Sequence, residues 1–362
     1  MPKAQPRVAV AMSGGVDSST AAALLVREGC EVVGVTMYVR AASPARSGSV
    51  AAHSADTTIE DAARVCVSLG IPHHVVDLSQ VFEREVIDSF AREYLNGRTP
   101  NPCMQCNQRI KFGSLAEHVK ELGAEALATG HYVQKAELPG RLALHRAVDP
   151  RKDQSYFLAG LNQEQLAFAR FPLGRFTKAQ IRDKARDFGL GIAERPESQD
   201  LCFSSSQDFR NVLIERTDTP APGPILSTTG KFLGQHKGLI YYTVGQRKGL
   251  NTAAPRPLYV VRLDPQRNAV IVGVERETYA REMTVTGVQW SGLPPQTTPF
   301  CCQVQIRYRH SAAHCEVTPS GHNLLVVFPE PQKAVTPGQW AVFYNEDVVL
   351  AAGTINDFSP IL

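Results

Sequence analysis

Long hydrophobic runs are missing from this sequence of 362 residues. None approaches the roughly 20 apolar residues of a membrane-spanning helix, which excludes a protein built around such a helix. Residues 1–7 contain two prolines and pass straight into a strand-like run, without the apolar stretch and cleavage site of a secretion signal. Internal repeats and low-complexity tracts are missing as well. We therefore expect a cytoplasmic globular protein, and a chain of this length favours two or three domains.

A strong net charge is also lacking, because 38 Lys and Arg face 35 Asp and Glu, for a net charge of +3. The distribution is more informative than the sum. Residues 231–310 hold eleven Lys and Arg against four Asp and Glu. This local excess suits contact with the phosphate backbone of a nucleic acid, although a solvated basic surface without a partner would look the same.

Neither common nucleotide loop follows the first apolar run, residues 8–11: there is no Gly-rich loop ending in Lys-Ser or Lys-Thr, and no G-x-G-x-x-G. Residues 13–19 instead read Ser-Gly-Gly-Val-Asp-Ser-Ser and open into a helical run. Two glycines allow a sharp turn and a close approach to an anion, and the helix directs its first N–H groups toward that anion. The segment predicts a site for ATP phosphates; the alternative is a Gly-Gly turn with a polar helix cap.

The first half of the sequence alternates short apolar strands with helices, which is typical of a parallel sheet covered on both faces. Strands are expected at 8–11, 31–39, 73–77 and 126–130, and helices at 16–28, 59–69, 82–95, 110–122 and 178–188, with a mobile loop over 41–57. Beyond a Pro-rich linker at 219–224, short strands separated by turn residues dominate. We expect an α/β protein with a parallel-sheet domain over 1–209, a small mixed domain over 210–280 and a β-barrel over 281–362.

Three of the eight cysteines occupy polar segments. Cys103 and Cys106 form a C-x-x-C just before a helix, beside Arg109 and Lys111, and Cys202 lies in a stretch that we interpret as a loop. Positive charge and a helix N-terminus favour the thiolate and hence a reactive cysteine. A structural zinc site and buried, inert thiols are the alternatives.

Taken together, these segments resemble the tRNA-specific 2-thiouridylases of the ATP-pyrophosphatase superfamily, which replace oxygen by sulfur at position 2 of the wobble uridine. The resemblance covers nearly the whole sequence and includes the loop 11–18, Arg-Thr-Pro-Asn-Pro at 98–102 with Cys-Asn at 106–107, Ala-Thr-Gly-His-Tyr at 128–132, Lys-Asp-Gln-Ser-Tyr-Phe-Leu at 152–158, Cys-Phe at 202–203, Thr-Val-Gly-Gln-Arg-Lys-Gly-Leu at 243–250, Arg-Tyr-Arg at 307–309 and Ala-Val-Thr-Pro-Gly-Gln at 334–339.

The resemblance implies an adenine-nucleotide α-hydrolase-like fold for the first domain and a role for each matching residue. ATP, with Mg²⁺, would be bound by Ala11, Met12, Ser13, Gly14, Gly15, Val16, Asp17, Ser18, Met37 and Gly130. The tRNA would be contacted by Asn101, Pro102, Cys103, His131, Lys152, Asp153, Gln154, Arg307, Tyr308 and Gln339. Cys106 would be the catalytic nucleophile and Cys202 the persulfide carrier, with a disulfide between them as sulfur leaves. The partners would be tRNA and a sulfur donor, and the chain is expected to act as a monomer.

One residue departs from the family pattern, because many relatives have Asp where this sequence has Cys103. A thiol cannot take over the proton-transfer role of that carboxylate. Cys103, Cys106 and Cys202 could instead hold a [4Fe–4S] cluster with one iron open to sulfide. The sequence leaves open a persulfide relay, such a cluster, and a disulfide between Cys103 and Cys106.

Two other functions stay open. One is a different adenylating enzyme of the superfamily, such as a ligase that forms a C–N bond, although amination requires neither Cys106 nor Cys202. The other is an RNA-binding protein with a vestigial nucleotide site, although the Ser-Gly-Gly-Val-Asp-Ser-Ser loop is intact.

Overall fold

The computed structural model describes residues 5–39, 50–194, 210–214, 216, 221–250, 252 and 254–361. These residues divide into two compact units. Unit 1 takes its residues from 1–87, 103–207 and 347–349, and unit 2 from 88–102, 208–346 and 350–362. A boundary between the two units therefore falls between Pro102 and Cys103.

Unit 1 is built on a parallel sheet with the strand order β3-β2-β1-β4-β7. Its strands are β1 (Arg7–Ala11), β2 (Glu31–Tyr38), β3 (His73–Asp77), β4 (Ala126–Ala128) and β7 (Ala169–Arg170). Val8 and Val10 of the central strand are completely buried, as expected for a strand covered on both faces. The sheet confirms the predicted α/β class. The strand order reverses between β1 and β4, which is where open α/β sheets bind ligands.

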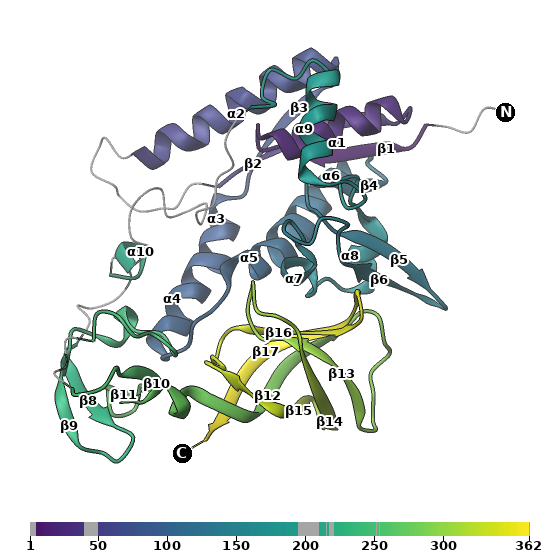
Figure 1. Cartoon of the computed structure of the whole chain (residues 1–362). Helices are drawn as coiled ribbons and strands as arrows, with labels where there is room; N and C mark the ends of the chain where they lie inside the picture. The colour runs from purple at the N-terminus through teal and green to yellow at the C-terminus, as the bar shows by residue number, and fades with distance from the viewer. Residues whose placement is uncertain are drawn as a thin grey trace. The chain divides into compact units, whose positions relative to one another are not determined.

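Helices connect these strands and cover the sheet. They are α1 (Val16–Arg27), α2 (Val50–Leu69), α3 (Ser79–Phe82), α5 (Pro102–Gln105), α6 (Ala116–Glu121), α7 (Ser155–Leu158), α8 (Gln163–Phe168) and α9 (Lys178–Asp187), with π-helical turns at Glu83–Ile87 and Cys106–Leu115. α1 packs against both α2 and α9 (Figure 1). A capping box between Thr177 and Gln180 fixes the start of α9, because each side chain bonds the backbone N–H of the other residue.

One local prediction for unit 1 was wrong, and one hairpin was not predicted. The expected loop over 41–57 ends early, since α2 begins at Val50; the alanines of this stretch favour a helix. Residues 40–49 lie outside the described residues. The hairpin of β5 (Gln134–Leu138) and β6 (Arg141–His145) was not expected, although its Pro139-Gly140 turn signals one.

Unit 2 contains the helices α4 (Asp88–Leu95) and α10 (Arg210–Ile214) and a small mixed sheet with the order β10-β11-β8-β9. Its strands are β8 (Gly223–Ser227), β9 (Phe232–His236), β10 (Tyr259–Asp264) and β11 (Ala269–Gly273), and 3-10 turns lie at Leu239–Tyr241 and Glu275–Thr278. The pairing of β8 with β11 is parallel, whereas the other two pairings are antiparallel. This confirms the expected small mixed domain.

A closed antiparallel barrel forms the rest of unit 2. Its strands are β12 (Tyr279–Trp290), β13 (Phe300–Gln305), β14 (Ala313–Ser320), β15 (Asn323–Lys333), β16 (Trp340–Asn345) and β17 (Val348–Pro360). The order is β12-β15-β14-β13-β16-β17, and pairing of β12 with β17 closes the ring (Figure 1). Apolar side chains such as Val304, Val326 and Phe343 fill the interior. The predicted β-barrel is therefore confirmed. Among the helices that the structure describes, none is long and apolar enough to cross a membrane.

Candidate functional site

The loop between β1 and α1 has the geometry of an anion site. Gly14 adopts a φ of +65°, and a Cβ on it would lie 2.5 Å from the Cβ of Asp61, so only glycine fits. Gly15 is the N-cap residue of α1 and provides no side-chain cap. The helix therefore begins without a side chain that would compete with an anion for its first N–H groups.

Serine hydroxyls hold this loop in shape. The Ser13 N–H donates to Ser18 Oγ, and the Ser13 and Ser18 hydroxyls lie 3.2 Å apart. The hydroxyls of Ser18 and Ser19 both donate to the Gly15 carbonyl, at 3.2 and 2.9 Å. Ser18 and Ser19 are buried, whereas Ser13 is exposed and presents its hydroxyl at the surface. The loop is thus organised before any ligand binds.

The segment after β4 closes tightly over the same loop. A Cβ on Gly130 would lie 2.8 Å from the Ser18 nitrogen and 2.9 Å from the Asp17 carbonyl carbon. Both are backbone atoms, so a larger residue would displace the start of α1. Met37 is half-buried near the carboxyl end of β2. The predicted ATP residues therefore gather at the carboxyl ends of β1, β2 and β4, in unit 1.

Asp17 in the first turn of α1 is bound by residues from two distant segments. Tyr132 donates its hydroxyl to Asp17 Oδ1 at 2.6 Å, and Lys178 Nζ lies 2.7 and 2.8 Å from the two carboxylate oxygens. The ammonium also lies 5.7 Å from the centre of the Tyr132 ring. Asp17 is thereby neutralised at the edge of the phosphate loop.

The two cysteines of the C-x-x-C occupy one continuous helical stretch. Cys103 lies in α5 and is exposed, and Cys106 begins the π-helical turn and is half-buried. Desolvation raises the pKa of the half-buried Cys106 thiol, and the nearby charge of Lys111 lowers it by less. Arg109 is instead paired with Glu85 at 3.3 Å. The expectation that the thiolate is favoured here was therefore wrong for the free protein, because loss of water outweighs the cation.

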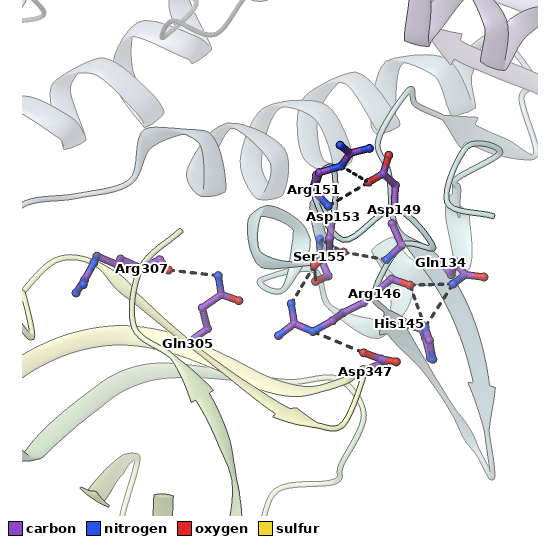
Figure 2. A network of polar contacts seen from close by, with 11 residues as sticks. Gln134, His145, Arg146, Asp149, Arg151, Asp153, Ser155, Gln305, Arg307 and Asp347 are labelled. Atoms are coloured by element: carbon purple, nitrogen blue, oxygen red, sulfur yellow. Dashed lines mark hydrogen bonds and ion pairs between the residues drawn. The ribbon is translucent and has the colours of Figure 1, made fainter. Parts of the chain in front are cut away.

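The segment 146–155 is fixed by buried carboxylates (Figure 2). Asp153 accepts hydrogen bonds from the N–H groups of Ala147 and Ser155, from the Ser155 hydroxyl and from Arg146. Its side chain is 8% exposed, so its visible role is to shape the loop that presents Lys152. Arg146 also reaches Asp347 at 3.9 Å.

Gln154 pairs with Tyr132 through both backbone and side chain. The Gln154 N–H donates to the Tyr132 carbonyl at 2.8 Å, and the Tyr132 N–H donates to Gln154 Oε1 at 2.9 Å. His131 is buried, lies 2.7 Å from the Thr129 hydroxyl and has a pKa far below its usual value, because burial disfavours its charged form. At neutral pH His131 is therefore an uncharged hydrogen-bonding group.

In unit 2 a cavity of about 520 Å³ is lined by residues from four of the motifs noted in the sequence. It is lined by Thr99, Thr243, Val244, Gly245, Arg307, Lys333, Ala334, Thr336 and Gln339. Arg307 donates to the backbone carbonyl of Lys333 at 3.0 Å, which fixes its guanidinium, while the Lys333 ammonium pairs with Glu275. Gln339 donates to the Thr99 carbonyl at 2.7 Å, and the Thr99 N–H donates to the Pro337 carbonyl at 2.8 Å. The strand ends of the barrel thus hold the chain just before Asn101 and Pro102.

A second cavity of about 430 Å³ in unit 2 is lined by residues that include Arg247 and Arg256. Tyr308 lies outside both lining sets, and the Arg309 guanidinium stands 5.6 Å from the centre of its ring. The excess of basic residues noted in the sequence thus supplies cations to two concave surfaces.

Comparison with known proteins decides the family. Residues 6–206 match the family model described as tRNA methyl transferase HUP domain, 211–274 the tRNA methyl transferase PRC-barrel domain and 280–355 the aminomethyltransferase beta-barrel domain. The chain is 46% identical to the tRNA-specific 2-thiouridylase MnmA of Symbiobacterium thermophilum, over 96% of this chain and 92% of that protein. Its identity to the MnmA of Geobacter metallireducens is 48%, over 98% of each chain. This chain belongs to the tRNA-specific 2-thiouridylase family.

Within this thiouridylase-family chain, the expected site residues are distributed over both units. The ATP residues, Cys103, Cys106, His131 and the segment 152–154 lie in unit 1, whereas Asn101, Pro102, Arg307, Tyr308 and Gln339 lie in unit 2. Cys202 lies outside the described residues. The described part of the chain holds no group of three His, Cys, Asp or Glu side chains suited to a metal ion. Of the three candidate cluster ligands, Cys103 and Cys106 lie in the described part of the chain and Cys202 does not.

The sequence alone indicates no role for two residues of this site, Lys178 and Tyr132. Lys178 was placed only as the first residue of a helix, and it is 161 positions from Asp17. Tyr132 was noted only within its motif. An acidic residue in a phosphate loop without a neighbouring cation was the one signal that a basic partner from elsewhere was needed.

Proposed function

We propose that this chain uses ATP to form 2-thiouridine at the wobble position of tRNA. The observation that carries the proposal is the preorganised loop Ser13 to Ser18 with Gly130 against it, in a chain related to thiouridylases over nearly its full length. ATP binds at the carboxyl ends of β1, β2 and β4, and its magnesium complex enters as the substrate. We further propose modules over 1–209, 210–280 and 281–362, and a monomer acting in the cytoplasm.

The first half-reaction is adenylation of the base. Uracil O2 attacks the α-phosphorus, the bond to the β-phosphate oxygen breaks, and pyrophosphate leaves with the electron pair. The N–H groups at the start of α1 and the Ser13 hydroxyl stabilise negative charge on the phosphates. The carbonyl oxygen, a poor leaving group by itself, then leaves as part of AMP.

The second half-reaction delivers sulfur. The terminal sulfur of a persulfide on Cys202 attacks C2 and expels AMP. The Cys106 thiolate then attacks the inner sulfur of Cys202, so that the S–S electron pair completes the thiocarbonyl and a disulfide between Cys106 and Cys202 forms. An external thiol reductant must reduce that disulfide before the next cycle, and a donor protein must reload Cys202.

The target base has to leave its stack to reach these groups, as bases in single-stranded loops do. We propose that Asn101, Pro102 and Cys103 contact this base and that Lys152, His131 and Gln154 contact the tRNA near it. Arg307 and Gln339 would bind the backbone in the larger cavity of unit 2. Fixed cations on a concave surface suit phosphates better than base edges.

The test is release of pyrophosphate and AMP from ATP in the presence of unmodified tRNA, with nucleoside mass spectrometry for 2-thiouridine. S-adenosylmethionine is added in place of ATP in a parallel reaction, because the matching family model is described as a methyl transferase. We expect pyrophosphate and AMP only with ATP and tRNA, and no methylated uridine. Failure of any tRNA to elicit pyrophosphate would contradict the proposal.

The form of the sulfur is tested by iron and acid-labile sulfide analysis after anaerobic purification. An iron-free protein that thiolates tRNA with a persulfide donor supports the relay through Cys202. Stoichiometric iron and sulfide that activity requires would replace the relay by a [4Fe–4S] cluster on Cys103, Cys106 and Cys202.

A further inference from the structure

The phosphate loop carries a carboxylate and no cation of its own. Asp17 is the only charged residue between Ala11 and Ser19. ATP brings several negative charges to this loop, and an unpaired carboxylate beside them would oppose binding. In a P-loop, a lysine inside the motif itself supplies positive charge to the β- and γ-phosphates. Here the cation has to come from another part of the chain.

Lys178 supplies that cation. Its ammonium lies within 2.8 Å of both Asp17 oxygens, and its side chain is only 11% exposed. Low exposure strengthens its electrostatic interactions, since little water screens them. Tyr132 contacts both groups: its hydroxyl donates to Asp17, and its ring faces the Lys178 ammonium. The positive charge is therefore confined to the edge of the loop.

The backbone of Lys178 is held independently of the ammonium. Lys178 is the first residue of α9, after the Thr177 cap, and α9 packs on α1. Its N–H donates to Asp149 Oδ2 at 3.1 Å, and Asp149 is 3% exposed. Because these contacts fix the main chain, the flexible side chain can exchange partners without moving its helix. A lysine ammonium with three donors on a four-carbon stem suits such an exchange.

We propose that Lys178 contacts the β- and γ-phosphates of bound ATP. This inference rests on the proposed ATP-dependent function and adds a residue to it. Before ATP binds, Asp17 holds the ammonium at the loop. With ATP present, the ammonium contacts phosphate oxygens while it stays close enough to Asp17 to offset the carboxylate charge, and the Tyr132 hydroxyl keeps its bond to Asp17. As the bond between the α-phosphorus and the β-phosphate oxygen breaks, the electron pair moves onto pyrophosphate. Lys178 stabilises this growing charge, which a fixed cation in a low-dielectric site does efficiently.

A structural role is the alternative, in which Lys178 only neutralises Asp17 and so maintains the loop. The two roles differ in which nucleotide they affect. A cation on the β- and γ-phosphates acts on ATP and not on AMP, which lacks those groups. A cation that only maintains the loop acts on both nucleotides alike.

The experiment compares Lys178→Met and Lys178→Arg with the wild type. Calorimetry with α,β-methylene-ATP and with AMP gives two affinities for each variant, and pyrophosphate release with tRNA gives kcat and KM for ATP. We expect Lys178→Met to lose about 100-fold in kcat/KM for ATP and to bind the triphosphate analogue more weakly. Its affinity for AMP should stay within about twofold of wild type, and Lys178→Arg should recover part of the loss.

Lys135→Met is the matched control. Lys135 also lies in unit 1, but its ammonium donates hydrogen bonds to the carbonyls of Leu166 and Ala169. Equal weakening of AMP and of the triphosphate analogue in Lys178→Met would overturn the inference, as would unchanged pyrophosphate release. If Lys178→Met does not fold, Lys178→Arg decides by the same comparison of the two nucleotides. A wild-type protein that releases no pyrophosphate contradicts the proposed function itself, which is a separate result.

Discussion

The side-chain amide of Gln339 donates a 2.7 Å hydrogen bond to the carbonyl of Thr99, a residue 240 positions earlier in the chain. Gly338 beside it is equally constrained, since a Cβ there would lie 2.8 Å from the Thr99 nitrogen. Both residues belong to unit 2. The barrel therefore sets the position of the chain that leads to Asn101 and Pro102.

Gln339→Ala should lower the free energy of unfolding by about 1 kcal/mol, because it removes a partly buried hydrogen bond and leaves the Thr99 carbonyl without that donor. It should also raise the KM for tRNA, since Asn101 and Pro102 lose their support. Chemical denaturation and thiolation kinetics measure the two effects. Gln296→Ala is the control, because Gln296 donates only to the nearby Pro294 carbonyl. A variant with wild-type stability and KM would show that the bond supports nothing.

Gly130→Ala should raise the KM for ATP by tenfold or more, which corresponds to about 1.4 kcal/mol of lost binding. The added methyl meets the backbone of Asp17 and Ser18, which must move together with the phosphate loop. Gly191→Ala serves as the control, because a Cβ there meets nothing within 4 Å. Steady-state pyrophosphate release gives the KM of each variant. Equal KM values for ATP in Gly130→Ala and Gly191→Ala would contradict the close approach of Gly130 to the backbone of Asp17 and Ser18.

Lys111→Met should move the reactivity of Cys103 and Cys106 to higher pH. Burial already raises the pKa of the Cys106 thiol, and the Lys111 charge lowers the pKa of both thiols. Without that charge the pKa rises further, so less thiolate is present at neutral pH, and reactivity returns only as the pH approaches the new pKa. Iodoacetamide labelling from pH 6 to pH 10, read by mass spectrometry, measures the shift. Arg109→Gln should leave the profile in place, because Arg109 pairs with Glu85; a shift of equal size there would refute the assignment to Lys111.

Cys106→Ser and Cys202→Ser should each abolish 2-thiouridine formation, because a hydroxyl neither carries a persulfide nor attacks a disulfide-linked sulfur. Affinity for tRNA should stay within about threefold of wild type, since a serine keeps the size of the side chain. Gel-shift titration and nucleoside mass spectrometry separate binding from chemistry. Cys301→Ser is the control, an exposed thiol on the barrel. Loss of tRNA binding in both variants would favour a structural role.

Much of the fold could be predicted because its signals are local. The apolar run 8–11 and the helix after Gly15 follow from hydrophobic pattern and glycine chemistry, and the structure has β1 and α1 at these places. The start of α2 was missed because a polar, small-residue stretch is compatible with both helix and loop.

The missing parts of the site depend on contacts that sequence spacing does not encode. Asp153 was expected to face tRNA from its motif alone, whereas its four internal hydrogen bonds become visible only when Ala147, Arg146 and Ser155 fold around it. The cation of the phosphate loop comes from the start of α9, far along the chain. The reactivity of Cys106 depends on desolvation, which adjacent charges in the sequence do not reveal.

Tyr132 bonds the Gln154 segment through its backbone and the phosphate loop through its hydroxyl. One residue thus joins the loop proposed to contact RNA, through its backbone, to the loop proposed to contact ATP, through its hydroxyl. If tRNA orders the first loop, the second is ordered with it, and thermodynamic linkage makes the effect reciprocal. The factor by which bound tRNA raises the affinity for ATP must equal the factor by which bound ATP raises the affinity for tRNA. Tyr132→Phe removes only the hydroxyl and should bring both factors toward one.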